Sequence, residues 1–585
     1  MLPRTLNEIF FNVVERNVPR LMLWKKAEDW LSTSTVEFYA QVVATANALS
    51  KLGIQRGDRV AILSETRREW TVADFATLLI GGVVVPIYPT LTAEQTAFML
   101  QDSGARAIFV SNEKQLAKVS SIRDQTNLEH VILMDEGGEA PSMAEFMVAR
   151  PGPKDEPLER LARSIVPEDL ATIIYTSGTT GVPKGVMLTH ANMASNLACS
   201  LYGIDLGPGD VSVSYLPLSH ITARHLDFAV LQLGVTVAYI TSIEQLPQAL
   251  KEVRPTIFVG VPRLYEKVHG QVALKTQAGF KKKLFDWALK VGRAHNAEVL
   301  NGKAPTSLQW KLANRLVFSK VREGMGGAVR IFISGGAPLG MKLAQWYADV
   351  GIRIHEGYGL TETAPVIALN NSLVHRLGTV GKPLSNVEVK IAGDGEILVR
   401  GPSIFSSYWN KPEETKAAFE DGWFRTGDVG NLDADGFLSV TDRKKDLIKT
   451  SGGKFIAPQP LENALKHNPL VAEAVVVGDK RRFACVLIAP NFPALEDWAK
   501  VHAAGFGSRE ELVRTDSVVS LYSGIVEGLN KDLAQFEKLK KVFLVAETFS
   551  TEDGTLTASM KLRRRIVEDR YRGQIEKLYE EQAAG

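Results

Sequence analysis

The chain has 585 residues and a formal net charge of +2 at pH 7, and 45% of its residues are hydrophobic. Its length is too great for one hydrophobic core, so we expect at least two domains, and its near-neutral charge argues against binding of nucleic acid through bulk charge. Its two cysteines, Cys199 and Cys485, are too few for a disulfide framework or a Cys/His zinc cluster.

No targeting or membrane-spanning segment is predicted. Met1–Arg20 has interspersed charges and lacks the apolar core of a signal peptide. The longest apolar run, Phe75–Ile87, is interrupted by Thr, Gly and Pro and is too short to cross a bilayer. We therefore expect a cytoplasmic protein.

Strands alternate with helices in the first part of the chain, after helices around a short strand pair in Met1–Ile54. The pattern predicts strands Arg59–Leu63, Val83–Ile87 and Ala107–Val110, separated by helices Glu69–Ile80 and Thr92–Ser103. This alternation indicates parallel βαβ units. The polar, proline-rich segment Asp135–Glu168 is interpreted as a surface connection.

A segment rich in glycine and hydroxyl groups, Tyr175–Gly185, follows the next predicted strand, Ala171–Tyr175. Its glycines let the backbone take positive φ and approach a ligand, its hydroxyls are donors, and its lysine adds a positive charge. The residues concerned are Gly178, Gly181, Gly185, Thr176, Ser177, Thr179, Thr180 and Lys184. They suit a polyphosphate, although an ordinary polar loop has a similar composition. No Gly-Lys-Ser/Thr closes the segment, so it is not a Walker A loop.

The order Tyr-Thr-Ser-Gly-Thr-Thr-Gly-x-Pro-Lys-Gly resembles the phosphate loop of the adenylate-forming superfamily of acyl-CoA synthetases, luciferase and peptide-synthetase adenylation domains. Further family motifs follow in the expected order over nearly the whole chain. The resemblance implies an α/β fold: a large N-terminal domain of parallel-rich sheets with helices and a β-rich subdomain, and a small mobile α+β C-terminal domain. The expected limits are 1–442 for the large domain, 443–446 for a hinge and 447–585 for the small domain.

The resemblance also implies how ATP and Mg²⁺ bind. The turn after the strand that begins at Ile331 is expected beside adenine, Tyr358 along adenine, and Thr361 near the α-phosphate. Asp428 would accept the ribose hydroxyls, and Thr176 and Glu362 would hold Mg²⁺, which prefers hard oxygen ligands. The expected nucleotide-binding residues are Thr176, Ser177, Gly178, Thr179, Thr180, Gly181, Lys184, Gly335, Gly336, Ala337, Glu356, Gly357, Tyr358, Gly359, Thr361, Asp428, Arg443 and Lys445.

Three lysines are expected to act in two domain arrangements. By resemblance, Lys445 lies where the backbone rotates, and Lys449 lies near the phosphate and acyl groups during thioester formation. Lys561 is expected to enter the site during adenylation. The commoner family pattern has Gly before this lysine, whereas this chain has Met560, as in the long-chain branch.

For the acyl side of the site, the residues leave two interpretations open at each position. His220 either faces the acyl pocket or is a satisfied core histidine, and Tyr265 either gates an acyl tunnel or is a packed aromatic. A long helical insertion, Arg263–Met325, resembles the long-chain branch. Within it Phe280, Leu284, Trp287 and Val291 form an apolar stripe beside Lys281–Lys283, which predicts either a membrane-surface helix or packing with solvated lysines.

Taken together, the resemblance implies an ATP-dependent, AMP-forming ligase that activates a long-chain fatty acid as acyl-adenylate and transfers it to coenzyme A. Alternatives are an acyl-AMP or aryl-acid ligase with another acceptor, and a catalytically dead nucleotide- or lipid-binding relative. The expected cofactor is Mg²⁺, with ATP and CoA as cosubstrates. We expect transient contact with the inner face of a membrane, and analogy with the family suggests a homodimer.

Overall fold

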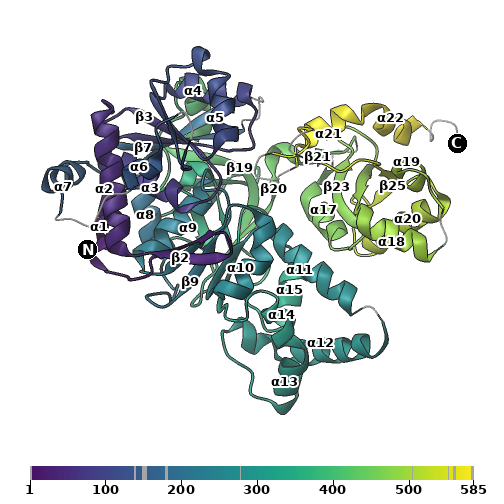
Figure 1. Ribbon diagram of the computed structural model, residues 1–585. Coiled ribbons are helices and arrows are strands. Elements are labelled where there is room, and N and C mark those ends of the chain that lie inside the picture. The colour runs from purple at the N-terminus through teal and green to yellow at the C-terminus, as the bar shows by residue number, and fades with distance from the viewer. Residues whose placement is uncertain are drawn as a thin grey trace.

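The structure is a computed structural model, and it describes residues 3–137, 140–147, 154–177, 182–276, 278–451, 454–502, 505–550, 553–557 and 562–580. The chain forms a large body and a smaller C-terminal lobe beside it, joined near strand β20 (Leu438–Arg443; Figure 1). The mixed α/β class predicted from the resemblance is confirmed.

A six-stranded sheet carries the segment expected to bind phosphate. Its strands lie in the order β6-β5-β3-β4-β7-β8, and all but the β7–β8 pair are parallel. Their bounds are β3 Arg59–Leu63, β4 Val83–Ile87, β5 Ala107–Val110, β6 His130–Leu133, β7 Leu170–Ser177 and β8 Pro183–Thr189. The predicted parallel βαβ units are confirmed, with β3, β4 and β5 at their predicted bounds.

Helices surround this sheet and meet in an aromatic core. The rings of Phe10, Phe38, Phe75 and Phe228 form a chain with centroids 4.9 to 5.8 Å apart, so four helices share one buried cluster. The helices of this region are α1 Leu6–Glu15, α2 Thr35–Lys51, α3 Arg68–Leu79, α4 Ala93–Ser103, α5 Glu113–Ser120, α8 His190–Ser200 and α9 Ile221–Gln232. Capping boxes begin α2, α4 and α8.

Two further sheets complete the α/β part of the large body. One has the order β2-β1-β10-β9 and the other β11-β12-β13-β14-β15. Their bounds are β1 Met22–Lys26, β2 Asp29–Thr33, β9 Val211–Ser214, β10 Thr236–Tyr239, β11 Ile257–Gly260, β12 Ile331–Ser334, β13 Ile354–Gly359, β14 Val366–Leu369 and β15 Lys382–Pro383.

A projection of helices leaves the large body between β11 and β12 (Figure 1). It comprises α11 Pro262–Lys275, α12 Gly279–Leu300, α13 Leu308–Ala313, the π-helical η3 Asn314–Phe318 and α14 Ser319–Glu323. It packs against α15 Met341–Asp349, and α10 Leu246–Val253 lies beside it. The predicted helical insertion is thus confirmed.

A β-rich unit and the C-terminal lobe follow. The first comprises β16 Glu388–Ile391, β17 Glu396–Arg400, β18 Phe419–Glu420, β19 Trp423–Leu432 and β20 Leu438–Arg443, with α16 Pro412–Ala418. The lobe has the strand order β23-β24-β25 and the short β21–β22 pair. Its bounds are β21 Ile448–Lys449, β22 Phe455–Ile456, α17 Pro458–Lys466, β23 Val471–Val477, β24 Ala484–Pro490, α18 Phe492–Val501, α19 Arg509–Leu512, α20 Asp516–Asn530, β25 Leu539–Leu544, α21 Arg564–Arg570 and α22 Arg572–Glu580.

Two local interpretations are corrected. The segment read as a connection contains α6 Met143–Met147 and α7 Glu156–Arg163; Asp155 caps α7, and Leu158 on its inner side is buried. The predicted stripe of α12 does not pack as a unit, because Phe280 is 78% exposed whereas Leu284 packs against the core and Val291 is buried. No helix in the described ranges is long and apolar enough to span a bilayer.

Candidate active site

The β7–β8 hairpin holds the two ends of the predicted phosphate loop side by side. Thr176 pairs with Lys184 and Ser177 with Pro183 across the antiparallel strands. Gly178, Thr179, Thr180 and Gly181, which connect the strands, lie outside the described residues. Gly185 does not take a positive φ as predicted; its role is close packing, because a Cβ there would lie 2.7 Å from Ile173 Cγ2.

Lys184 and Glu362 are linked through Tyr408, which the sequence did not single out. The Lys184 Nζ lies 5.2 Å from the centroid of the Tyr408 ring, and the Tyr408 hydroxyl donates to Glu362 Oε1 at 3.0 Å. Burial raises the pKa of Glu362 above its ordinary value, although the Tyr408 donor and the charge of Arg443 oppose this shift. The cluster therefore joins a cation and a partly desolvated carboxylate beside the hairpin.

Asp428 is fixed by two partners from different strands. Its Oδ2 accepts from the Tyr358 hydroxyl at 2.6 Å, and its Oδ1 lies 2.8 Å from Arg443 Nε. Asp428 and Arg443 are register partners in β19 and β20, while Tyr358 comes from β13. Burial and the negative charge of Asp428 raise the pKa of Tyr358, so its hydroxyl keeps its proton and acts as donor. The structure thus brings together three residues predicted to bind the nucleoside.

The turn after β12 is held by a buried carboxylate. The backbone N–H of Leu339 donates to Glu356 Oε2 at 3.3 Å, and burial raises the pKa of Glu356 to about 7. Gly336 has φ +84°, which favours glycine, and Gly336 and Ala337 are exposed. The N–H of Gly335 donates to Gly260 O at 3.3 Å, which fixes the start of the turn. Glu356 therefore positions the turn expected beside adenine.

Close backbone packing shapes the segment from β13 into the short helical turn η4 Thr361–Thr363. A Cβ on Gly359 would lie only 1.8 Å from Pro365 O, and one on Gly357 would lie 3.0 Å from Leu369 Cδ1. Glycine is therefore required at position 359 by the approach of the neighbouring chain. Thr361 lies at the start of η4, directly before Glu362.

Lys445 and Lys449 lie at the junction with the C-terminal lobe, and both are exposed. Lys449 belongs to β21; its backbone N–H donates to Asp479, and its Nζ lies 5.5 Å from the Phe455 ring. The contacts of Lys449 are thus with the lobe in this arrangement. Lys561 lies outside the described residues.

The lobe touches the large body next to the adenine turn. Arg263 Nη1 on α11 lies 3.0 Å from Glu473 Oε1 on β23, and Asn463 Nδ2 donates to Pro338 O at 3.4 Å. At the junction itself, the backbone N–H of Gln459 donates to Asp442 Oδ2 at 3.0 Å. These contacts hold one relative position of the two units.

Both predicted acyl-side residues have structural contacts. His220 is the N-cap residue of α9, and its Nδ1 accepts from the Thr222 backbone N–H at 3.2 Å. Tyr265 has no exposed surface; its hydroxyl donates to Ile333 O at 2.9 Å, and its carbonyl accepts from Tyr347 at 2.7 Å. In this arrangement Tyr265 is a packed aromatic residue with a satisfied hydroxyl.

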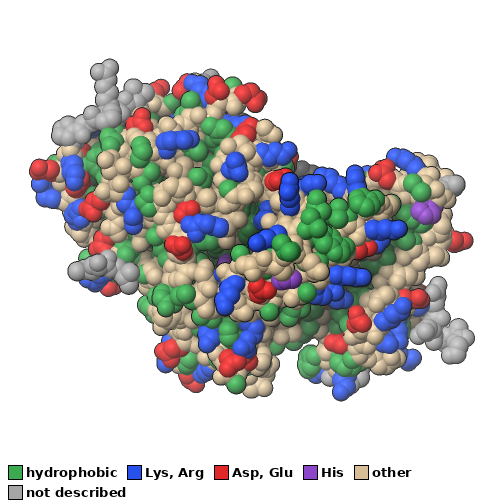
Figure 2. Space-filling view, turned by 90° about the horizontal axis from the view of Figure 1, so that it is seen from below, with side chains coloured by type: hydrophobic (Ala, Val, Ile, Leu, Met, Phe, Trp, Pro, Cys, Tyr) green, Lys and Arg blue, Asp and Glu red, His purple; other side chains and the backbone are tan. Residues whose placement is uncertain are grey.

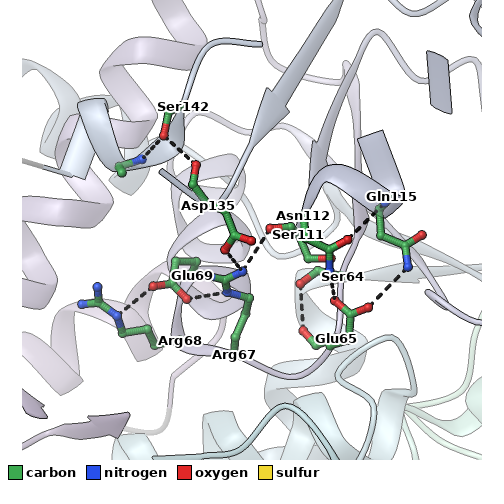
Figure 3. A network of polar contacts seen from close by, with 11 residues as sticks. Ser64, Glu65, Arg67, Arg68, Glu69, Ser111, Asn112, Gln115, Asp135 and Ser142 are labelled. Atoms are coloured by element: carbon green, nitrogen blue, oxygen red, sulfur yellow. Dashed lines mark hydrogen bonds and ion pairs between the residues drawn. The ribbon is translucent and has the colours of Figure 1, made fainter. Parts of the chain in front are cut away.

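A polar network occupies the carboxyl ends of β3, β5 and β6 (Figure 3). Arg67 contacts Glu69 at 2.8 Å and Asp135 at 2.7 Å, and it donates to Ser111 O at 3.1 Å. Thr66 lies in the loop that follows β3. Its hydroxyl donates to Leu216 O at 2.7 Å and so fixes the segment that leads to His220. Ligands of parallel α/β sheets bind at this edge in general. In this protein, side-chain contacts occupy the edge of the sheet at β3, β5 and β6, away from the β7–β8 hairpin.

A metal site made of protein ligands alone is not found: no group of three or more His, Cys, Asp or Glu among the described residues could hold an ion. The donor set at Glu362 fits a different kind of site, in which Mg²⁺ takes one carboxylate and completes its shell with phosphate oxygens and water. Asp428 is engaged by Tyr358 and Arg443, which leaves Glu362 as the carboxylate beside the hairpin.

Comparison with known proteins shows which family the chain resembles over its whole length. The model of the AMP-binding enzyme family matches residues 11–409, and the model of the AMP-binding enzyme C-terminal domain matches residues 445–583. The long-chain-fatty-acid–CoA ligase FadD15 of Mycobacterium bovis is 36% identical over 97% of this chain and 95% of its own length. The long-chain-fatty-acid–CoA ligase ACSBG2 of Xenopus laevis is 33% identical over 99% of this chain and 84% of its own.

Solved structures show the same fold. The adenylation domain of a carboxylate reductase from Mycobacterium chelonae has a TM-score of 0.76 and 23% identity, covering 98% of this chain and 91% of that one. A fatty acyl CoA synthetase from Mycobacterium tuberculosis has a TM-score of 0.63 and 23% identity, covering 98% and 99%. With both parts of the chain matched by family models and full-length relatives above 30% identity, the chain belongs to the AMP-binding enzyme family.

Proposed function

We propose that this enzyme is an ATP-dependent, AMP-forming ligase that activates a long-chain fatty acid as acyl-adenylate and transfers the acyl group to coenzyme A. The observation that carries the proposal is the 36% identity over 97% of the chain to a relative named as a long-chain-fatty-acid–CoA ligase. The cluster of Tyr358, Asp428 and Arg443 supports a nucleotide as one of the substrates.

The chemistry requires two displacements. A carboxylate is a poor electrophile because its negative charge repels nucleophiles and oxide is a poor leaving group. In the first step a carboxylate oxygen attacks the α-phosphorus of ATP, the bond to the bridging oxygen breaks, and pyrophosphate leaves. In the second step the CoA thiolate attacks the acyl carbon, and AMP leaves with the electron pair of the acyl–oxygen bond. The protein therefore needs no covalent nucleophile.

The nucleoside would be held by the buried cluster around Asp428. This carboxylate would accept hydrogen bonds from the ribose hydroxyls, while Arg443 keeps it ionised and oriented. The Tyr358 ring would lie along adenine, and the exposed turn at Gly336 leaves the backbone open to a flat base. The Glu356 carboxylate positions this turn from behind.

The phosphates would be bound at the β7–β8 hairpin. The first step gathers negative charge, so it requires preorganised cations and N–H donors. Lys184 would supply one cation, and Thr176 and Glu362 would hold Mg²⁺ together with phosphate oxygens. When bound, Mg²⁺ would neutralise phosphate charge. The Tyr408 hydroxyl would keep the Glu362 carboxylate in position.

The small domain would alternate between two positions. The division into domain 1–442, hinge 443–446 and domain 447–585 is supported by two observations: β20 ends at Arg443, and the C-terminal family model begins at residue 445. Rotation near the exposed Lys445 would exchange Lys561, acting in adenylation, for Lys449, acting in thioester formation.

The direct test is a mass-spectrometric product assay. The protein is incubated with ATP, Mg²⁺ and a panel of acids, aliphatic ones from acetate to oleate and benzoate as an aromatic one, with and without CoA. Palmitoyl- or oleoyl-CoA with equimolar AMP is the expected result. Acyl-AMP that accumulates and ignores CoA would identify a ligase for another acceptor, and turnover of aromatic acids alone would identify an aryl-acid ligase. Binding of ATP and lipid without pyrophosphate release would identify a catalytically dead relative. Repeating the assay with EDTA tests the need for the metal.

A further inference from the structure

The helical run α13–η3–α14 carries an apolar stripe on its outer side. Leu308, Leu312 and Leu316 recur at every fourth position and are 83%, 50% and 37% exposed. On the opposite side Trp310 and Phe318 are buried in the core shared with α12 and α15. The inner side of this run is therefore packed against the core, and its outer side also carries apolar side chains. An outward stripe of three leucines on a packed helix indicates a contact with something outside the chain.

Positive charge predominates along the same run. Between Glu298 and Glu323, the last residue of α14, the chain contains no Asp or Glu, whereas it contains Lys303, Lys311, Arg315, Lys320 and Arg322. Arg322 bonds to Asn314 and to Val350 O inside the structure. The other four form no ion pair with another described residue, in contrast to Lys282 on α12, which pairs with Asp286 at 2.7 Å.

Charge and position decide what can cover this stripe. A second copy of the chain would bring the same unpaired cations face to face, which disfavours a symmetric dimer here. An anionic lipid surface supplies both the apolar depth that the leucines need and the negative charge that the cations need. Within the run, α13 lies at the far end of the helical projection, so a flat surface can reach it without meeting the sheets (Figure 1).

We propose that the outer face of α13–η3–α14 is a docking surface for an anionic lipid bilayer. Leu308 and Leu312 insert at the boundary between headgroups and acyl chains, and Lys303, Lys311, Arg315 and Lys320 pair with lipid phosphates. On the side of the molecule viewed from below Figure 1, hydrophobic side chains are bordered by many lysine and arginine side chains (Figure 2). This surface is not the apolar stripe on α12 that the sequence predicted. Of that stripe, the residues after Phe280 pack against the core. The proposal does not rest on the proposed function, because lipid binding needs neither ATP nor CoA.

The test is vesicle flotation of the full-length protein without nucleotide, using phosphatidylcholine vesicles with or without phosphatidylglycerol. We expect binding only when phosphatidylglycerol is present, and weaker binding as salt is raised. The double variant Lys311→Glu/Arg315→Glu is expected to lower the partition constant at least about tenfold. The double variant Leu308→Ser/Leu312→Ser is expected to lower it to a similar extent.

Matched controls separate the surface from general effects. Lys114→Glu/Lys416→Glu makes the same change in net charge on α5 and α16, and Val501→Ser removes another apolar side chain, 80% exposed, on α18. Both are expected to bind vesicles as the parent protein does. Thermal unfolding of every variant confirms that it is folded.

Four outcomes would overturn the proposal. Two concern the parent protein: equal flotation with neutral vesicles, or no flotation at all. In the third, the two double variants bind vesicles as tightly as the controls. In the fourth, Leu308→Ser/Leu312→Ser halves the mass measured by light scattering and leaves lipid binding unchanged, which would assign the face to self-association.

Discussion

At the scale of single residues, the proposed mechanism places two lysines in separate steps. Lys561→Ala should slow acyl-AMP formation by about a hundredfold or more, because a cation that stabilises developing charge is lost. Supplied acyl-AMP should still react with CoA at nearly the parent rate. Lys449→Ala should show the reverse pattern. Pyrophosphate release and thioester formation are measured separately in single turnovers.

The matched control for these lysines is Lys480→Ala, because Lys480 is an exposed lysine of the same lobe. It should leave both half-reactions unchanged. Equal loss of both half-reactions in Lys561→Ala would contradict the assignment of this lysine to one of two arrangements.

A second prediction at the residue scale concerns Asp227, a buried residue of the core, and the dependence of stability on pH. It is 2% exposed, Ser214 donates to its Oδ2 at 3.0 Å, and burial raises its pKa to about 7 from an ordinary value of 3.8. Between these two values the folded state holds a proton that the unfolded state has lost. Stability from this group is therefore present at low pH and decreases as pH rises towards 7.

Asp227→Asn should remove this pH dependence. Between about pH 5 and about pH 8 the unfolding free energy of the parent should fall by about 2–3 kcal/mol relative to the variant. Scanning calorimetry at the two pH values measures the difference. Asp205→Asn, at a side chain 98% exposed, is the control and should show no such change. A constant difference between Asp227→Asn and the parent would show that the buried carboxyl does not titrate in this range.

At the scale of elements, the close contact of β13 with the chain before β14 requires glycine. A Cβ on Gly359 would meet the Pro365 carbonyl at 1.8 Å, so Gly359→Ala must move one of the two segments. We expect a loss of at least about 2 kcal/mol in stability and a large loss of adenylation, because Tyr358 and Glu362 flank the contact. Calorimetry and pyrophosphate release measure the two effects.

Gly524→Ala on α20 is the control for this element. A Cβ there meets no atom within 4 Å, and the residue lies inside a helix. This substitution should raise stability by roughly 0.5–1 kcal/mol, since alanine is the better helix former. If Gly359→Ala were equally harmless, the two chain segments would have to be free to separate.

The elements also show what the sequence can and cannot predict. Periodicity and β-branched runs are local signals, so β3, β4 and β5 were predicted at their observed bounds, and the motif order identified the family. Tyr408 was missed because its bond to Glu362 joins positions 46 residues apart in sequence, which no local pattern encodes. The exposure of Phe280 was missed because a helical stripe predicts which side is apolar and not where the packing partner ends. The helix α7 was missed because its proline, Pro157, and its charges are typical of a loop, while its cap Asp155 and the burial of Leu158 favour a helix.

At the scale of the whole molecule, the contacts between the lobe and the large body set the balance between arrangements. Arg263 on α11 pairs with Glu473 on β23 at 3.0 Å, with Arg263 48% and Glu473 11% exposed. A domain rotation of the proposed kind would break this pair, so it favours the arrangement seen here. Ion pairs of this exposure contribute up to about 1 kcal/mol, which corresponds to about fivefold in a population ratio.

Arg263→Ala should therefore shift the two half-reactions in opposite directions, each by no more than about fivefold. The step catalysed in the observed arrangement becomes slower and the other faster when domain position limits the rate. Single-turnover rates of pyrophosphate release and of thioester formation from supplied acyl-AMP measure this. Arg400→Ala breaks a comparable pair, Arg400–Glu388 at 2.7 Å, within one sheet, and should change neither rate. Parallel changes in both rates for Arg263→Ala would mean that this contact acts on the site itself and not on the position of the lobe.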